Sequence, residues 1–428
     1  MRGLLALALF FSSAQAAPLS LEGAAAYALA HSPKFDSAQR QTLIAEMGRK
    51  NAVAAFLPTL DFTSAHGLQR SYPKTDPNEP WASSFSFTLA ETLYDNGESI
   101  TKHRIASIQE ELSRLQLERE RDRLLLAVAS AFFQRMQAQK NLETQQEQNG
   151  ILKKQVELVR DSYRQGVKTR KDYLRFQTQL NRADIDLLRA KDGVLKADQE
   201  LKKILGVPLD SDERLEFAMD DKRAGRIAPA SFVPEKHRDY KVAELQRRVS
   251  GLNTQLASRK LWPEVGLALN GTYGSSGYVG PGKSVRSVYE RDSSSWSAFL
   301  TLKYNIFDFG LRRRNAEIAA ETAAVQSNDL ESQLLDLRSE VSQLQSDLRQ
   351  LQESFRISEE LLKLEQGNLA LISSEYRQGK VQYLDYITSL QNVASARSSY
   401  YSALYELRKG ELSQKYHEGK IYEAILGK

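Results

Sequence analysis

The stretch Gly277–Ser284, GYVGPGKS, matches the phosphate-binding loop G-x-x-x-x-G-K-[ST] of nucleotide hydrolases. In that loop, backbone N–H groups and the start of a helix converge on the phosphates, so a buried strand must precede the motif and a helix must open at the Lys-Ser pair. Here an alternating, half-polar segment precedes the motif, and VRSVYERDSSSW after it carries no helical stripe of apolar residues. We therefore predict an exposed loop in which Lys283 and Ser284 bind no nucleotide.

The other residue types that could do chemistry form no catalytic or metal-binding pattern. The 5 histidines are scattered without H-x-x-x-H or H-E-x-x-H spacing, and the chain has 0 cysteines. Without cysteine there is neither a disulfide nor a thiolate metal site. No pair of convergent polar groups stands out, so we predict no enzyme, no metal site and no cofactor.

Charged residues are interleaved along the chain. There are 59 basic and 54 acidic residues, which gives a formal net charge of +5, and the run ERERDR from Glu118 to Arg123 shows how closely the signs alternate. Such alternation is typical of solvated helix faces. A nucleic-acid partner would need a concentrated basic patch, so we predict none.

The N-terminus has the ordered regions of a secretory signal peptide. Arg2 precedes an apolar run from Leu4 to Phe11, and Ala14-Gln15-Ala16 fits the small-x-small cleavage pattern. We predict that residues 1–16 are a signal peptide; the alternative is a short buried helix. No later apolar run reaches the about 18 to 20 residues of a spanning helix, so we expect an exported protein without a membrane helix.

The chain contains a duplicated unit. Tyr163-Arg-Gln-Gly166 recurs as Tyr376-Arg-Gln-Gly379, and LYDNG, which ends at Gly97, recurs as IFDFG, which ends at Gly310. The offset is the same for both motifs, because 379 − 166 and 310 − 97 both equal 213. We predict two tandem repeats, residues 17–213 and 214–428.

Each repeat is predicted to contain a long antiparallel helical hairpin, at about 98–205 and 311–415. Apolar residues recur at spacings of three and four, and no proline occurs from Trp81 to Val207 or after Gly282. Roughly 60 helical residues would form a rod of about 90–100 Å. Each YRQG motif would mark the turn, with its glycine in a left-handed conformation.

Four intervals instead alternate between apolar and polar residues, as strands do: 58–72, 83–94, 263–274 and 295–307. Their length suits strands that cross an outer membrane, although an ordinary soluble pair of hairpins is the alternative. Four strands cannot close a spanning barrel, and open sheet edges are not tolerated in lipid. We therefore expect the chain to contribute strands to a shared barrel.

With these motifs the chain resembles the TolC family of outer-membrane efflux proteins. The resemblance rests on the two equivalent halves, the L-Y-D-x-G and I-F-D-x-G motifs, the Y-x-x-G tips followed by aspartate, and the opening segment LSLEGAAAYALAHSPKFDSA. It implies a mainly helical fold in which a homotrimer forms a twelve-stranded β-barrel continuous with a periplasmic α-barrel. It also implies an equatorial region near 206–235 and the C-terminus.

The resemblance further implies a periplasmic entrance formed at the helix tips. The residues implied there are Asp385, Asp172 and Tyr376. The residues implied to dock an adaptor are Tyr163, Arg164, Gln165, Gly166, Tyr376, Arg377, Gln378 and Gly379. The sequence departs from the family pattern at Val381, where an arginine would complete a gate link, and at Thr388, where a second acidic ring would lie. Each aspartate could instead be a helix N-cap, and each YRQG could serve the turn alone.

The resemblance thus implies the outer-membrane channel of a tripartite export system. Its partners would be a periplasmic adaptor protein, an inner-membrane transporter and outer-membrane lipid, with small molecules as cargo. A type I protein secretion duct is the alternative, because the partner pump selects the substrate. A structural coiled-coil envelope protein would not explain the strands, and a periplasmic adaptor would carry one hairpin, whereas this chain is predicted to have two.

Overall fold

The computed structural model describes residues 20–68, 80–207, 234, 237–278 and 291–427. Within these ranges no helix combines the length and hydropathy that a membrane-spanning helix needs. Three predicted features fall wholly or mainly outside the described residues. They are the signal peptide, the loop that carries Lys283 and Ser284, and the equatorial region near 206–235.

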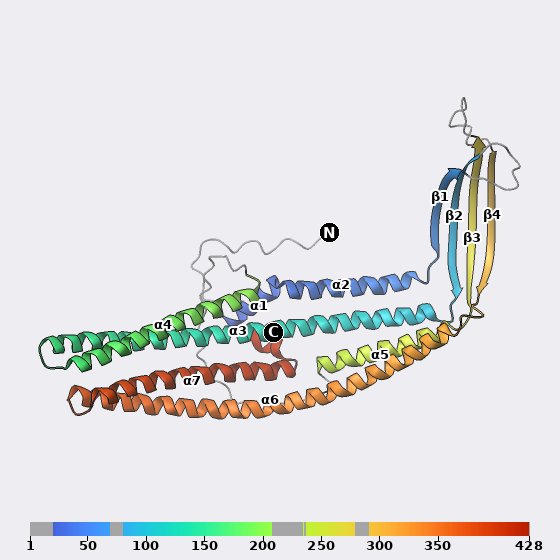
Figure 1. The fold of residues 1–428 in the computed structure, drawn as a ribbon. Helices are drawn as coiled ribbons and strands as arrows, with labels where there is room; N and C mark the ends of the chain where they lie inside the picture. The colour runs from blue at the N-terminus through green and yellow to red at the C-terminus, as the bar shows by residue number, and fades with distance from the viewer. Residues whose placement is uncertain (1–19, 69–79, 208–233, 235–236, 279–290, 428) are drawn as a thin grey trace. The chain divides into compact units, whose positions relative to one another are not determined.

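The described residues form helices and strands in the order of Figure 1. They are α1 (Leu21–His31), α2 (Pro33–Ala54), β1 (Thr59–Leu68), β2 (Pro80–Tyr94), α3 (Glu98–Arg164), α4 (Arg170–Leu205), α5 (Arg238–Arg259), β3 (Glu264–Tyr278), β4 (Arg291–Lys303), α6 (Leu311–Arg377), α7 (Tyr383–His417) and α8 (Ile421–Leu426). The mainly helical fold, with two strands and a long helical hairpin in each half, is confirmed.

The two halves have matching helices. α3 and α6 contain 67 residues each, and α4 and α7 contain 36 and 35. In α4 the buried residues Ala183, Ala190 and Ala197 recur every seven positions, so one narrow stripe of small side chains faces the neighbouring helix. This spacing lets long helices pack lengthwise.

The chain divides into two compact units that do not coincide with the repeats. Unit 1 comprises Met1–Gln39, Gln116–Tyr240 and Leu334–Lys428, and unit 2 comprises Arg40–Leu115 and Lys241–Gln333. Each unit therefore takes segments from both predicted repeats. The duplication describes how the sequence is built, whereas the units describe which residues pack together.

Unit 2 contains a four-stranded antiparallel sheet in the order β1-β2-β3-β4. Phe62 of β1 pairs with Phe87 of β2, and Leu89 of β2 pairs with Leu269 of β3, so apolar residues lie beside one another across the strands. The two predicted strand pairs thus join through β2 and β3 (Figure 1). Among the described residues, β1 and β4 are the sheet edges.

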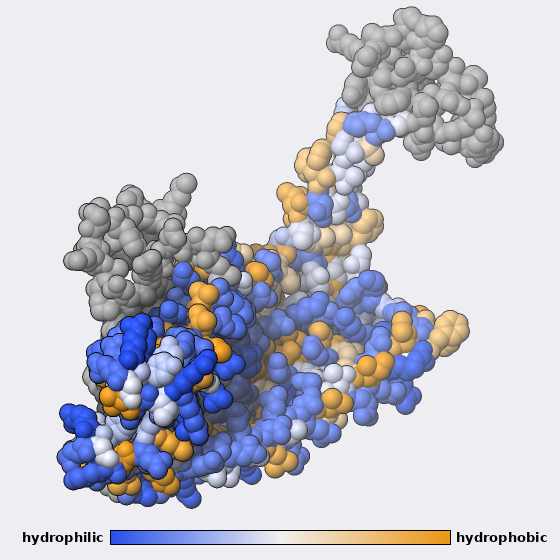
Figure 2. Space-filling model, turned by 60° about the vertical axis from the view of Figure 1, so that its left-hand side comes forward, coloured by the Kyte–Doolittle hydropathy of each residue, from blue (hydrophilic) through white to orange (hydrophobic). Residues whose placement is uncertain are grey.

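The edge strand β4 exposes a row of large apolar side chains. Trp296, Leu300 and Leu302 alternate along one face and are 83%, 71% and 69% exposed. Figure 2 shows hydrophobic side chains on the exposed surface of the sheet. A single chain leaves this apolar face uncovered, and soluble monomers rarely expose such a row.

Two equivalent turns connect the sheet to the long helices. Asp95 accepts hydrogen bonds from the N–H groups of Gly97 (3.0 Å) and Ser99 (2.6 Å). Asp308 accepts from the N–H groups of Gly310 (3.1 Å) and Arg312 (3.2 Å). These bonds satisfy the first free N–H groups of α3 and α6, which explains why an aspartate precedes the glycine by two residues in both motifs.

Unit 1 has its main core where the N- and C-terminal helices meet the long helices. Leu125, Phe132 and Met136 of α3 are buried with Leu201 of α4 and Tyr405 of α7, and residues of α1 and α8 complete the cluster. Gly206 ends α4 at φ +78°, where a Cβ atom would lie only 2.8 Å from the carbonyl oxygen of His31. Only glycine fits this close approach of α4 to α1.

Candidate functional site at the helix tips

Both YRQG motifs form the same helix ending in unit 1. At the end of α3, the N–H of Gly166 donates to the carbonyl of Tyr163 and the N–H of Val167 donates to that of Ser162. At the end of α6, Gly379 and Lys380 donate in the same way to Tyr376 and Glu375. This pair of bonds is the Schellman motif, and the glycines have the left-handed φ of 75° and 73° that it requires.

The two predicted entrance aspartates lie in the first turns of the return helices. Asp172 accepts hydrogen bonds from the Thr169 hydroxyl (2.8 Å) and from the Thr169 N–H (3.4 Å), which closes a capping box at the start of α4. Asp385 accepts from the N–H of Gln382 (3.2 Å) at the start of α7. The structure therefore gives both aspartates a capping role, which leaves room for a second role because their carboxylates have further lone pairs.

The environments of these two carboxylates differ. The hydrogen bond from the Thr169 side chain holds the pKa of Asp172 below its usual value. The side chain of Asp385 is exposed, as are those of Arg164, Gln165, Arg377 and Gln378 in the two tip motifs. These exposed groups form a polar surface at the two turns.

A tyrosine of each tip motif stacks on a tyrosine of its own return helix. The rings of Tyr163 and Tyr173 are parallel within 8° with centroids 6.0 Å apart, and those of Tyr376 and Tyr386 are parallel within 8° at 5.0 Å. Both pairs obey the 213-residue offset. The predicted entrance residue Tyr376 therefore also packs against the return helix of its own hairpin.

A second group of contacts joins the two hairpins of unit 1 near the tips. Phe176 of α4 is buried, and its ring centroid lies 3.7 Å from that of Tyr383 at the start of α7. Burial raises the pKa of Tyr386 of α7, and the side chain of Gln155 of α3 acts in the opposite direction. Leu152 and Ile387 are buried in the same cluster.

The tyrosines at this contact have raised pKa values. Burial raises the pKa of Tyr383 to about 12, and the neighbouring Tyr376 and Asp172 act in the same direction. Burial also raises the pKa of Tyr376, with contributions from Tyr386 and Asp172. The structure therefore brings Asp172, Tyr376 and Tyr383 together, whereas Asp385 is not among the groups that act on these tyrosines.

Sequence reasoning missed Phe176, Tyr383 and Gln155. The repeat could not have identified the two aromatic residues, because Ser389 and Arg170 occupy the equivalent positions at the 213-residue offset. The one available signal was an aromatic residue near a repeated motif whose counterpart in the other repeat is not aromatic. Such asymmetry is expected where the two halves of a duplicated chain contact each other.

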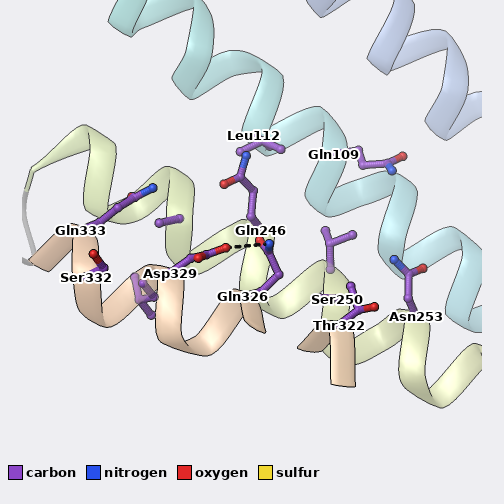
Figure 3. Close-up of a pocket in the computed structure, with 13 residues that line it drawn as sticks. Gln109, Leu112, Gln246, Ser250, Asn253, Thr322, Gln326, Asp329, Ser332 and Gln333 are labelled. Atoms are coloured by element: carbon purple, nitrogen blue, oxygen red, sulfur yellow. Dashed lines mark hydrogen bonds between the residues drawn. The ribbon is translucent and has the colours of Figure 1, made fainter. Parts of the chain in front are cut away.

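Unit 2 contains a separate polar groove between α3, α5 and α6, with a volume of about 570 Å³ (Figure 3). Amide and hydroxyl side chains dominate its lining, among them Gln109, Gln246 and Asn253. Its one carboxylate, Asp329, accepts a hydrogen bond from Gln326 at 3.0 Å. The groove thus offers hydrogen-bonding groups without a nucleophile paired to a base. In the part of the chain that the structure describes, no three His, Asp or Glu side chains are placed to hold a metal ion.

Comparison with known proteins gives one family. The sequence profile described as outer membrane efflux protein matches residues 25–207 and 233–413. The fold is similar to that of the CmeC outer membrane channel of Campylobacter jejuni (TM-score 0.79, 12% identity, 98% of this chain and 90% of that one). It is also similar to VceC of Vibrio cholerae (TM-score 0.74, 14% identity, 95% and 96%) and to CusC (TM-score 0.78, 15% identity, 97% and 95%).

A curated relative matches part of the chain. The alkaline protease secretion protein AprF of Pseudomonas aeruginosa is 25% identical over 227 residues, which is 51% of this chain and 46% of AprF. The match therefore spans slightly less than half of that relative's length.

Proposed function

The chain belongs to the outer membrane efflux protein family, and from this premise we propose that it is the outer-membrane channel of a tripartite export system. Three copies would join their four-stranded sheets into one twelve-stranded barrel, continuous with a helical barrel in the periplasm. A periplasmic adaptor protein would connect this channel to an inner-membrane transporter that drives small-molecule efflux.

The open sheet carries this proposal. Lipid cannot satisfy the unpaired N–H and C=O groups of an edge strand, and spanning barrels have at least about eight strands. The edge strands β1 and β4 could each pair with a strand of a neighbouring copy and so complete the barrel. The exposed apolar row on β4 would then face lipid. Matching lengths of α3 and α6 support the two repeats, 17–213 and 214–428, which stay part of the proposal.

We assign the helix tips to the periplasmic entrance. In this assignment the Phe176–Tyr383 contact holds the two hairpins together in the closed state. Opening would separate the hairpins and expose Tyr383. Asp385 would line the entrance, and the exposed polar side chains of the two YRQG turns would contact the adaptor.

We further infer that the chain has no catalytic role. The polar groove of unit 2 holds amides, hydroxyls and one hydrogen-bonded carboxylate, and general acid–base or nucleophilic catalysis needs a positioned pair of reactive groups. Export by the proposed channel needs no such pair, because the inner-membrane transporter supplies the energy.

The match to AprF favours a second candidate function, the exit duct of a type I protein secretion system. AprF is described as an alkaline protease secretion protein, and about half of this chain aligns with it. The same channel would serve either function, since the partner transporter selects the cargo. Deleting the gene for this chain and measuring both secreted protein and sensitivity to small toxic compounds would separate the two.

Disulfide crosslinking between edge strands tests the assembly, because the natural chain has 0 cysteines and gives no background. Thr63→Cys in β1 would be combined in turn with Ser297→Cys and Thr301→Cys in β4. If neighbouring copies pair β1 with β4, at least one combination gives a covalent trimer after oxidation. The single-cysteine chains should give none.

A matched control uses two strands that pair within the chain. Thr88 and Asn270 are register partners in β2 and β3, so Thr88→Cys with Asn270→Cys should crosslink without increasing the mass of the chain. A stably folded monomer in native mass spectrometry, with crosslinks only in this control, would contradict the proposed channel.

A further inference from the structure

The two equivalent turns between the sheet and the long helices carry different residues at the position whose backbone φ is positive. Asn96 and Phe309 are the non-glycine residues with positive φ in the described chain, both at φ 54°, and they occupy the same position of the repeat. Asparagine tolerates the left-handed conformation, because its short polar side chain bonds locally. A bulky aromatic residue is an outlier there. The second repeat thus keeps a phenylalanine where the first has a residue suited to the turn.

Packing within unit 2 does not explain this phenylalanine. Its side chain is 81% exposed, and that of Phe307, whose ring centroid lies 4.6 Å away, is 72% exposed. The hydrogen bonds that Asp308 accepts from Gly310 and Arg312 hold the turn in shape. A strained backbone conformation persists only where the surrounding structure holds it, and such residues are common at functional sites. The positive φ of Phe309 therefore motivates a functional hypothesis for this turn.

Three consecutive arginines follow the exposed aromatic pair. Arg312 is used within the fold, because it donates to Asp308 (2.6 Å) and to the carbonyls of Lys260 (3.3 Å) and Asn305. The side chain of Arg313 is 83% exposed and pairs only at the surface, with Glu317 at 3.1 Å. Arg314 is also exposed and donates one bond to the carbonyl of Phe309 (2.9 Å).

The first repeat lacks this basic character. Ser99, Ile100 and Thr101 occupy the positions equivalent to the three arginines, and Glu98 occupies that of Leu311. The duplication therefore supplies an internal comparison. Tyr94 matches Phe307, but the three consecutive arginines and the phenylalanine at the position with positive φ occur in the second repeat alone, so the shared turn geometry does not require them.

The order of side chains along the chain matches the cross-section of one membrane leaflet. The exposed apolar residues Leu300 and Leu302 of β4 lead to Tyr304 and Ile306, then to Phe307 and Phe309, and then to the arginines. Apolar groups suit the acyl region, aromatic rings suit the interface, and arginine suits lipid phosphate, which its planar guanidinium binds through two parallel N–H groups.

We propose that Phe307, Phe309, Arg313 and Arg314 form a binding site for the headgroups of anionic phospholipids. The proposal rests on the proposed function, because it requires the sheet to lie in the membrane. In the site, Arg313 exchanges its surface partner Glu317 for lipid phosphate and Arg314 binds phosphate through its remaining N–H groups. The two rings pack beside the glycerol region and fix the depth of the sheet.

Lipid titration of the detergent-solubilised, full-length assembly tests the site by native mass spectrometry. The probes are short-chain phosphatidylglycerol, short-chain phosphatidylcholine and inorganic phosphate. The natural chain should retain phosphatidylglycerol in preference to phosphatidylcholine. Arg313→Gln and Arg314→Gln should each weaken that retention by roughly fivefold, as expected for one basic residue near an anionic surface. Phe309→Asn, which restores the residue of the first repeat, should weaken retention of both lipids.

The matched control is Lys102→Gln, an exposed cation one turn into α3, near the equivalent junction, where it pairs with Glu98. It should leave lipid retention unchanged. Equal retention of phosphatidylglycerol by the arginine variants would overturn the proposal, and so would inorganic phosphate that competes as well as the lipid, because the site would then be a simple anion site. The same spectra report the oligomer: an intact trimer without lipid preference contradicts this site alone, whereas a folded monomer contradicts the proposed function as well.

Discussion

The ring of Phe176, on the first helical hairpin, lies with its centroid 3.7 Å from the ring of Tyr383, at the start of the last long helix of the second hairpin. Phe176 is 1% exposed, and the tyrosine is sufficiently buried that its pKa rises to about 12. This contact links the two hairpins of unit 1 beside the turns that we assign to the channel entrance. It therefore provides the first place at which the proposed gate can be tested.

Phe176→Ala should loosen this contact and favour the open entrance. Removing a buried phenyl ring costs about 3–5 kcal/mol, which is large for a contact between two hairpins. We expect cells that carry the variant to become more permeable to large antibiotics and the purified channel to show higher single-channel conductance. Leu174→Ala is the matched control, since that leucine is on the same helix and 50% exposed. Equal permeability of the two variants would show that the contact does not restrain the entrance.

The local features of the tips could be predicted from the sequence. A Schellman ending needs a left-handed residue two positions after the last helical residue, so the glycine of each YRQG is visible without a structure. The recognised resemblance to the TolC family is confirmed by the family match, as is the fold class that it implied. Asp172 and Asp385 are not the N-caps that the alternative interpretation predicted: the N-caps are Thr169 and Gln382, and each aspartate is the third helical residue and accepts a hydrogen bond from the N–H of its N-cap.

The contacts between repeats could not be predicted from the sequence. Phe176 meets Tyr383 because two hairpins pack side by side, and neither residue has an aromatic counterpart in the other repeat. The division into two compact units was also hidden, because the long helices run through both units without a break in composition. Periodicity reports which face of a helix is buried, but it does not report which partner covers that face.

Acidification should weaken the contact between His237, just before α5, and His417 at the end of α7. His237 and His417 are stacked with ring centroids 5.7 Å apart, and burial lowers the pKa of both below the usual value, against the pull of Asp239 and Glu340. Below the ordinary histidine pKa the unfolded chain binds more protons than the folded one, so stability is present above that pH and is lost as the pH falls through the folded pKa.

Thermal unfolding between pH 7.5 and 5 measures this effect. The melting temperature of the natural chain should fall with pH, and His417→Gln should reduce the slope because it removes one of the two coupled groups. His66→Gln is the control, since that histidine lies in β1 of unit 2. An unchanged slope in the His417 variant would show that other groups govern the acid response.

The segment GYVGPGKS should bind no nucleotide. β3 ends at Tyr278 and pairs antiparallel with β4, which begins at Arg291, so the chain returns to the same sheet within a few residues of Ser284. Replacing Lys283 and Ser284 by alanine should leave assembly and export unchanged. Equilibrium dialysis with ATP measures binding directly, and saturable binding that Lys283→Ala abolishes would contradict the exposed-loop interpretation.

Asp385→Asn should reduce the cation selectivity of the channel. In the proposed trimer, three exposed carboxylates at a narrow entrance would raise the local concentration of cations and bind multivalent cations. Asparagine keeps a side-chain oxygen that can accept the hydrogen bond from the Gln382 N–H, so the start of α7 should remain intact while the charge is lost. Planar-bilayer recordings should therefore show a lower cation-to-anion permeability ratio and weaker block by periplasmic multivalent cations, with the trimer unchanged. Asp172→Asn should change selectivity less and opening more, because the Asp172 carboxylate is bound to Thr169 and acts on Tyr376 and Tyr383. If Asp385→Asn leaves selectivity and block as they were, that aspartate only caps its helix.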